Sequence, residues 1–269
     1  MCLLSTARAG ALAMQAHKPH LLILGGTGDA AAFARAVATA YGDRIQMTSS
    51  LAGRTRAPAS LPGAIRVGGF GGPDGLRAWI IAQGIDAVVD ATHPFAVQIS
   101  AHAVLAAAGA PLLRLERPAW TPGPGDDWRM VADIAAAAAL LPTVGRRAFL
   151  TVGASDLGAF SGLPCVYFLV RMVDVPDSPL FLANYDIVAA RGPFSKSDDA
   201  RLMKDHRLDV VVSKNSGGDA TVSKLDAARA AGVPVIMIAR PPDAAGGGSD
   251  RAATTEQALA WLKRVVGVD

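Results

Sequence analysis

Residues 21–31 decide the fold, and they read Leu21-Leu22-Ile23-Leu24-Gly25-Gly26-Thr27-Gly28-Asp29-Ala30-Ala31. Four branched apolar residues are typical of a strand buried on both faces, and the Ala-rich segment 29–40 has the propensity of a helix. Gly26, Gly28 and Ala31 fit the dinucleotide-binding pattern G-x-G-x-x-(G/A), in which small residues make the turn, admit the pyrophosphate and let the helix approach the strand. The stretch therefore predicts a strand, a phosphate-binding loop and a helix.

A glycine-rich turn after a strand also serves plain packing, so this loop alone leaves both interpretations open. The helix that follows would offer backbone N–H groups and the positive end of its dipole to a phosphate. If a nucleotide binds, the residues expected to contact it are Gly25, Gly26, Thr27, Gly28 and Asp29.

The second predicted strand, residues 45–50, indicates which nucleotide is bound. NAD sites normally place Asp or Glu at the end of this strand, where the carboxylate binds the ribose hydroxyls. This chain has Ser49 and Ser50 there, followed by Arg54 and Arg56. Hydroxyl and guanidinium groups suit a 2′-phosphate, so we expect NADPH, held by Ser49, Ser50 and Arg54. A solvated basic loop is the alternative.

Composition places the chain among enzymes with buried sheets. Its 269 residues are 51% hydrophobic and 18% charged, which suits an α/β protein of two lobes. The net charge of +3 and the lack of a basic run with interleaved aromatics argue against a nucleic-acid partner. No apolar run reaches the roughly 20 residues that a membrane span needs, so no membrane association is expected.

The two cysteines and five histidines do not form a recognisable site. Cys2 and Cys165 lie far apart, and no H-x-x-x-H or H-E-x-x-H spacing occurs, so we expect neither a disulfide framework nor a metal site. A cytoplasmic location follows. Residues 1–18 lack the basic region of a secretory signal and are expected to be a disordered extension, with either Met1 or Met14 as the true start.

Strand and helix signals alternate along the whole chain. Pro122, Gly123, Pro124 and Gly125 mark a crossing between two domains, which sets the boundary near Arg117. We expect an NADPH-binding Rossmann-like domain over residues 19–117 and a second, substrate-binding α/β domain over residues 118–269. The fold class is therefore α/β, with two Rossmann-like lobes that have parallel sheets and a cleft between them.

Further strands and helices are expected after the second strand. Further strands are predicted at residues 65–67, 85–89, 111–115, 128–131, 148–152, 165–171, 186–190, 209–213 and 234–238. Helices are predicted at residues 74–83, from about 94 to 108, and at 133–141, 195–206, 221–231 and 254–266. Residues 243–250 read as a surface loop.

Polar residues follow the strand at 85–89, at the edge of the sheet where ligands bind in doubly wound folds. Asp90, Thr92 and His93 are therefore expected at the mouth of the coenzyme crevice. Thr92 as an N-cap, with Pro94 in the first helical turn, would explain the Thr-x-Pro pattern without any chemistry. His93 has no such explanation, although a single histidine is more often packed or hydrogen-bonded than catalytic.

A second glycine loop, Lys214-Asn215-Ser216-Gly217-Gly218-Asp219, follows a predicted strand and precedes a predicted helix. Backbone N–H groups, a helix N-terminus and one ammonium group make it a second candidate site for an anion. Either a phosphate or a carboxylate would fit.

Several strings taken together resemble the precorrin-6A reductases of cobalamin biosynthesis over about residues 21–241. They are G-G-T-x-(E/D)-A at 25–30, S-L-A-G-R-T at 50–55, G-G-F-G-G at 68–72, D-A-T-H-P-F-A at 90–96, R-L-E-R-P at 114–118, R-G-P-F at 191–194, K-N-S-G-G at 214–218 and R-P at 240–241. The chain departs from the family in having Asp29 and Asp199 where many relatives carry Glu, which keeps the charge but shortens the reach.

The resemblance implies NADPH-dependent reduction of one double bond in a ring-contracted tetrapyrrole, converting precorrin-6A to precorrin-6B. The expected catalytic group is His93, Asp90 and Thr92, with Thr92 also near the coenzyme. His93 and Asp90 are the nearest candidates for the proton donor, and solvent or the carboxylates of the substrate are the alternative. The acidic macrocycle would be bound by Arg114, Arg117, Arg171, Arg191, Lys214, Asn215, Ser216, Gly217 and Arg240. Each of these cations has an ordinary ion pair as its alternative role.

Three other functions are compatible with parts of this sequence. A cobalt-precorrin-6A reductase that uses NADH differs only in substrate and coenzyme. A short-chain dehydrogenase needs Tyr-x-x-x-Lys, but Tyr41, Tyr167 and Tyr185 are not followed by lysine at that spacing. A non-catalytic NADP sensor would have no reason to line the second lobe with basic residues. The expected assembly is a monomer or small homo-oligomer.

Overall fold

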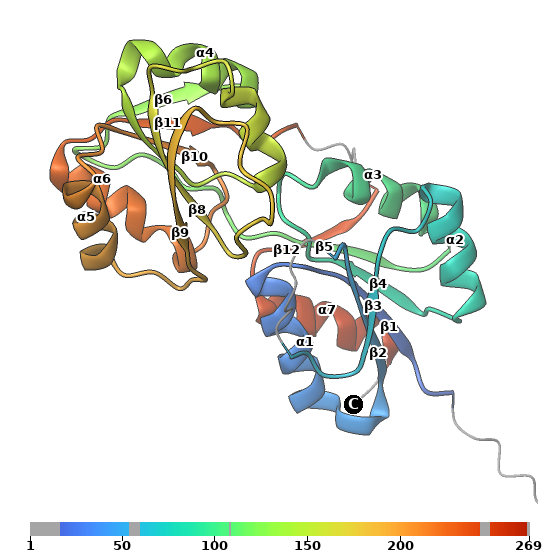
Figure 1. The fold of residues 1–269 in the computed structure, drawn as a ribbon. Coiled ribbons are helices and arrows are strands. Elements are labelled where there is room, and N and C mark those ends of the chain that lie inside the picture. Colours follow the sequence, from blue (N-terminus) through green and yellow to red (C-terminus); the bar gives the residue numbers. More distant parts are fainter. Residues whose placement is uncertain (1–16, 54–59, 108, 243–247, 268–269) are drawn as a thin grey trace, which may run out of the picture.

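The computed structural model describes residues 17–53, 60–107, 109–242 and 248–267, and it contains two six-stranded sheets in separate lobes (Figure 1). Every strand pairing in both sheets is parallel. The predicted fold class of two parallel α/β lobes is confirmed. No helix within the described ranges is long and apolar enough to cross a membrane.

The first sheet has the strand order β3-β2-β1-β4-β5-β12. Its strands are β1 His20–Leu24, β2 Gln46–Leu51, β3 Ala64–Val67, β4 Ala87–Asp90, β5 Leu112–Leu115 and β12 Asp250–Ala252. This is the 3-2-1-4-5-6 order of dinucleotide-binding sheets, in which the order reverses between β1 and β4. A ligand is therefore expected beyond the carboxyl ends of those two strands.

Helices cover both faces of the first sheet. On one face, α1 Gly28–Tyr41 and α7 Thr255–Val266 contribute Phe33 and Leu262 to the core with Leu21 and Ile23 of β1. On the other face lie α2 Pro73–Ala82 and α3 Val97–Ala106. The short 3-10 helix η1 Gly42–Arg44 follows α1.

The second sheet has the strand order β6-β11-β10-β7-β8-β9. Its strands are β6 Trp128–Val131, β7 Arg147–Leu150, β8 Tyr167–Met172, β9 Asn184–Ala189, β10 Val210–Lys214 and β11 Val235–Ile238. Helix α4 Ile134–Val144 and the 3-10 helix η2 Ala154–Phe160 cover one face. Helices α5 Lys196–Asp205 and α6 Ser223–Ala231 cover the other, with η3 Asp219–Thr221 just before α6.

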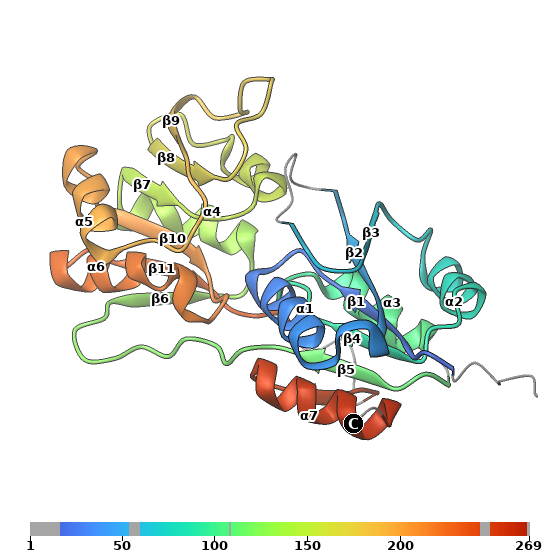
Figure 2. The same ribbon diagram turned by 90° about the horizontal axis from the view of Figure 1, so that it is seen from below.

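The C-terminal segment belongs to the first lobe, so assigning all of residues 118–269 to the second domain was wrong. Strand β12, which falls partly in the predicted loop, pairs with β5, and α7 lies beside α1 in Figure 2. This segment covers what would otherwise be an open sheet edge and an exposed apolar face, because Ala258, Trp261 and Leu262 are all buried there. The chain thus crosses to the second lobe and returns.

Because α7 completes the first core, truncating one of its buried side chains should unfold that lobe more easily. Leu262 is fully buried, so Leu262→Ala should lower the free energy of unfolding by about 3 kcal/mol in urea titrations. Ile81 is 73% exposed on α2, and Ile81→Ala should change it by less than about 0.5 kcal/mol. Equal effects of the two substitutions would show that α7 is not part of the core.

Candidate active site

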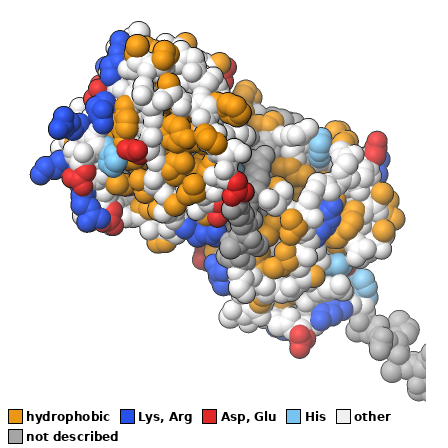
Figure 3. All heavy atoms as spheres, in the orientation of Figure 1, with side chains coloured by type: hydrophobic (Ala, Val, Ile, Leu, Met, Phe, Trp, Pro, Cys, Tyr) orange, Lys and Arg blue, Asp and Glu red, His pale blue; other side chains and the backbone are white. Residues whose placement is uncertain are grey.

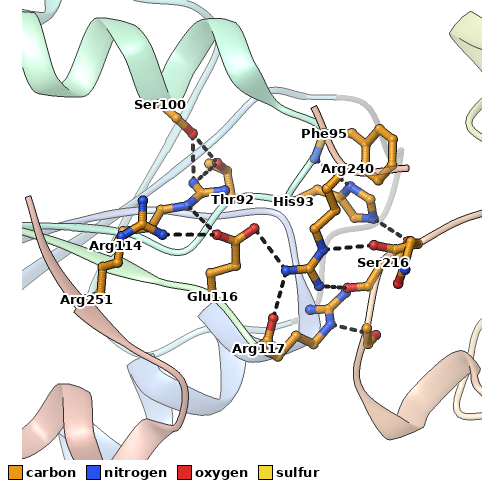
Figure 4. A network of polar contacts seen from close by, with 12 residues as sticks. Thr92, His93, Phe95, Ser100, Arg114, Glu116, Arg117, Ser216, Arg240 and Arg251 are labelled. Carbon is orange, nitrogen blue, oxygen red and sulfur yellow. Dashed lines mark hydrogen bonds and ion pairs between the residues drawn. The ribbon is translucent and has the colours of Figure 1, made fainter. Parts of the chain in front are cut away.

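Loops from the carboxyl ends of both sheets meet where the two lobes touch (Figure 4). The first lobe supplies the segment after β4, with Thr92, His93 and Phe95, and the segment after β5, with Glu116 and Arg117. The second lobe supplies Ser216, which follows β10, and Arg240, which follows β11. The loop 214–218 is called the junction loop below. Since ligands of parallel sheets bind at their carboxyl ends, this junction is the candidate active site.

The first glycine loop is shaped to accept a phosphate. Gly26 has a φ of +105°, and a Cβ added at Gly26 or Gly28 would meet no atom within 4 Å, so the space above both glycines is open. Thr27 is the N-cap of α1: its hydroxyl accepts a hydrogen bond from the Ala30 N–H at 3.0 Å and donates one to the Ala91 carbonyl at 2.7 Å. The loop therefore directs the N-terminus of α1 into open space, which fits the pyrophosphate of a nucleotide.

The end of β2 differs in detail from the expectation. The Ser49 hydroxyl is buried with no hydrogen-bond partner among the described residues, so it does not line the surface. Ser50 accepts a hydrogen bond from Arg66 at 3.4 Å. Arg54 lies outside the described residues.

Arg66 is a functional candidate that the sequence analysis missed. Its guanidinium lies 3.7 Å from the centre of the Phe70 ring and donates to the carbonyls of Gly68 and Gly69 at 2.6 Å each. It stands beside Ser50 at the carboxyl end of β3. The available signal was its position inside a short predicted strand just before the G-G-F-G-G loop.

Asp90 and Arg114 form a buried ion pair. Asp90 is 2% exposed and Arg114 is 7% exposed. One Asp90 oxygen accepts from Arg114, and the other accepts from the Thr92 N–H at 3.0 Å and the Thr92 hydroxyl at 2.7 Å. Arg114 also donates to Ser100 at 2.7 Å. These groups satisfy one another, so we propose neither Asp90 as the proton donor nor Arg114 as a substrate ligand.

Thr92 does not cap the helix that follows it. Helix α3 begins at Val97 after an N-cap at Ala96, later than the pattern predicted. The Thr92 hydroxyl is instead directed to Asp90, because a buried carboxylate with a neighbouring guanidinium needs more than one hydrogen-bond donor.

His93 connects the two lobes. The Phe95 N–H donates to its Nδ1 at 3.3 Å, so the proton lies on Nε2, which donates to the Ser216 hydroxyl at 3.0 Å. Burial, and then the positive charges of nearby side chains, lower the pKa of His93 to about 4; those side chains are Arg117, Lys214, Arg240 and Arg114. At neutral pH His93 is therefore an uncharged hydrogen-bond donor.

Phe95 packs the segment after β4 against the second lobe. The Phe95 side chain leaves the first lobe and packs against the core of the second. The ammonium of Lys214 lies 5.0 Å from the centre of its ring and also donates to Asp156 at 2.7 Å. The segment after β4 is thus an anchor between the lobes.

Two guanidinium groups hold the junction loop. Arg240 donates to the Asn215 carbonyl at 2.9 Å and the Ser216 carbonyl at 3.0 Å. It also reaches the Arg117 carbonyl at 3.0 Å and Glu116 at 3.3 Å. Arg117 donates to the Gly217 carbonyl at 2.7 Å and pairs with Asp29. The Asn215 amide exchanges two further hydrogen bonds with the Trp120 backbone, at 2.8 and 2.9 Å.

The two remaining predicted substrate ligands, Arg171 and Arg191, also belong to the second lobe. Arg171 is 8% exposed, pairs with Asp199, and stacks 3.7 Å from the centre of the Phe194 ring. Asp199 also accepts from Ser223 at 2.6 Å. This internal role removes Arg171 from the proposed substrate ligands. Arg191 is exposed just after β9.

No three side chains of His, Cys, Asp or Glu gather as a possible metal site within the part of the chain that the structure describes. Cys165 is a free, exposed thiol.

The lowered pKa of His93 makes stability depend on pH. Between about pH 6.5 and pH 4 the unfolded chain binds a proton at His93 that the folded chain does not, so stability is lost as pH falls through this range. The expected loss is about 2 to 3 kcal/mol, measured by urea unfolding at several pH values. His93→Gln should remove this component.

The matched control is His102→Gln, which replaces a half-buried histidine of α3 and should keep the wild-type pH dependence. If His93→Gln and wild type lost stability in parallel on acidification, His93 would not be the group that titrates.

Comparison with known proteins agrees with this architecture. The family model described as "Precorrin-6x reductase CbiJ/CobK" matches residues 20–263. A precorrin-6A reductase of Rhodococcus erythropolis is 51% identical over 82% of this chain and 89% of its own length. A cobalt-precorrin-6A reductase of Priestia megaterium is 33% identical over 82% of this chain and 90% of its own.

A solved structure named CobK precorrin-6A reductase superposes with a TM-score of 0.86, at 42% sequence identity, over 92% of this chain and 97% of that one. The family model and these relatives each span most of the described residues. The chain belongs to the precorrin-6x reductase family.

Proposed function

We propose that this chain reduces precorrin-6A to precorrin-6B with NADPH during cobalamin biosynthesis. The single observation that carries the proposal is the open N-terminus of α1 above Gly26 and Gly28, next to a junction loop of the second lobe that is surrounded by cations. One molecule of NADPH and one proton would be consumed, a carbon–carbon double bond would become a single bond, and NADP⁺ would leave.

In this proposal the protein contributes to the reaction by holding the coenzyme and the substrate in position. Hydride transfer, which the nicotinamide supplies when bound, needs donor and acceptor carbons about 3 to 3.5 Å apart. In our proposal the N–H groups at the start of α1 hold the pyrophosphate, and the junction loop holds the macrocycle opposite. His93, neutral at pH 7, orients the loop through Ser216 and is no longer proposed as the acid. Solvent or a substrate carboxyl group supplies the proton.

Cations at the junction suit an acidic tetrapyrrole. Arg117, Lys214 and Arg240 raise the positive potential there, which is the cause of part of the low pKa of His93. On the face shown in Figure 3, blue Lys and Arg atoms lie where the lobes meet, next to orange hydrophobic side chains of the second lobe. A macrocycle with apolar faces and carboxylate arms matches such a surface. The Asn215 and Ser216 N–H groups donate within the second lobe, so the N–H groups of Gly217 and Gly218, with Lys214 and the exposed Arg191, are the proposed carboxylate ligands.

NADPH is proposed over NADH because no carboxylate stands at the end of β2. Ser50 and Arg66 lie there instead, with Arg54 in the following segment. The higher identity to a precorrin-6A reductase than to a cobalt-precorrin-6A reductase favours the cobalt-free substrate. We further propose a cytoplasmic monomer or small homo-oligomer that has no nucleic-acid or membrane partner.

Arg66 should discriminate between the two coenzymes. Arg66→Gln should weaken NADPH binding about 10- to 100-fold, which corresponds to the loss of one charged hydrogen bond, and leave NADH binding nearly unchanged. Binding is measured by titration calorimetry, and Arg77→Gln, a change of an exposed arginine on α2, is the control. If Arg66→Gln weakens the binding of NADPH and NADH equally, Arg66 only supports the loop.

Activity itself is tested by adding precorrin-6A to the protein with NADPH and following loss of NADPH absorbance together with the mass of the product. The proposal expects one NADPH consumed for each tetrapyrrole gaining two hydrogens. Failure to consume NADPH, with both ligands bound, would overturn it.

A further inference from the structure

Arg117 touches the two proposed binding sites at once. It follows β5, and its Nη1 pairs with the carboxylate of Asp29 in the first turn of α1. Its Nε donates to the Gly217 carbonyl of the junction loop at 2.7 Å. The Arg117 side chain is 20% exposed and that of Asp29 is 39% exposed, so solvent, and therefore a ligand, can reach the pair. The Arg117 guanidinium thus links α1, the helix proposed to bind the coenzyme, to the second lobe.

Asp29 needs this partner if a pyrophosphate binds beside it. A carboxylate in the first turn of a helix interacts favourably with the helix dipole. The same carboxylate repels a phosphate that approaches the N–H groups of that turn. Arg117 compensates the charge of Asp29, so the pair carries no net negative charge next to the proposed phosphate position. Coenzyme affinity should therefore depend on Arg117 mainly because Asp29 is present.

The junction loop packs closely against the Arg117 side chain. Gly218 has a φ of +76°, and a Cβ there would overlap the methylene next to the Arg117 guanidinium. Gly217 has a φ of +69°, and a Cβ there would overlap the Pro118 carbonyl oxygen. Any other residue at either position would displace the arginine or the loop. The close fit means that a shift of the guanidinium moves the loop.

We propose that Arg117 is a positioning residue that lets two anionic ligands, the coenzyme and the acidic tetrapyrrole, bind side by side. This inference rests on the proposed function. Without Arg117, the pyrophosphate, Asp29 and the substrate carboxylates would repel one another across the junction. With it, one cation faces both ligands, and its hydrogen bond to Gly217 fixes the loop. Since linkage is reciprocal, each ligand should change the affinity of the other by the same factor.

The test uses the full chain with NADP⁺ and precorrin-6A, a pair that binds without turnover because no hydride is available. The dissociation constant of NADP⁺ is measured with and without saturating precorrin-6A, and the ratio gives the coupling factor. In the wild type, bound precorrin-6A should leave NADP⁺ affinity unchanged or improve it. In Arg117→Gln, NADP⁺ alone should bind about 10-fold more weakly, and precorrin-6A should weaken it further.

Adding Asp29→Asn to Arg117→Gln should restore NADP⁺ binding in the absence of precorrin-6A, because the uncompensated carboxylate is gone. The antagonism between the two ligands should remain, because the cation between them is still missing. A purely structural role of Arg117 would not be rescued by a change at Asp29. Arg117→Lys keeps the positive charge but lacks the planar guanidinium, so it should preserve most of the coupling factor.

The control is Arg129→Gln, an exposed arginine paired with Asp127 on the second lobe, which should behave as wild type. An unchanged coupling factor in Arg117→Gln, or a double variant with no recovery of NADP⁺ affinity, would overturn the inference while the proposed function stands. A wild-type protein that binds neither ligand would overturn the proposed function, and this inference with it.

Discussion

The guanidinium groups of Arg117 and Arg240 hold the carboxyl edges of two parallel sheets against each other, and the rest of the site depends on this contact. A partly buried guanidinium must satisfy its N–H groups, and here backbone carbonyls of the junction loop accept many of them. Glu116 lies among Arg114, Arg240 and Arg251 and balances part of their charge. The geometry between the lobes is thus fixed by hydrogen bonds that few other side chains could replace.

This arrangement has a chemical consequence for the neighbouring groups. Burial, and then the positive charge of the neighbouring side chains, lower the pKa of His93, so at neutral pH it donates a hydrogen bond to Ser216 as an uncharged imidazole. The same charge favours an acidic ligand at the junction. In the proposed reaction such a site would act by alignment, because a hydride transfer needs no covalent nucleophile.

Much of the fold could be predicted from the sequence, because buried parallel strands are continuous apolar runs that need no long-range information. The segment from Leu21 to Ala31 specified strand, loop and helix as observed. Strand β12 was missed because it has three residues, two of them charged, and becomes a strand only by pairing with β5. Its position in turn determined the lobe to which α7 belongs.

The site was harder to predict because a charged residue looks the same in sequence whether it binds substrate or another side chain. Arg114 and Arg171 stand at strand ends, as ligand-binding arginines do, but their partners Asp90 and Asp199 are distant in the sequence and fill their hydrogen bonds. Arg66 was overlooked for the opposite reason: only its stacking on Phe70 and its place beside Ser50 distinguish it from a surface residue.

The position of the bound coenzyme decides whether the first sheet and the junction loop act together as one site. A crystal structure with bound NADPH measures this directly. We predict the pyrophosphate over Gly26 and Gly28 at the N-terminus of α1, with the nicotinamide directed toward the junction loop. Coenzyme phosphates bound instead at Gly217 and Gly218, or away from the first sheet, would contradict it.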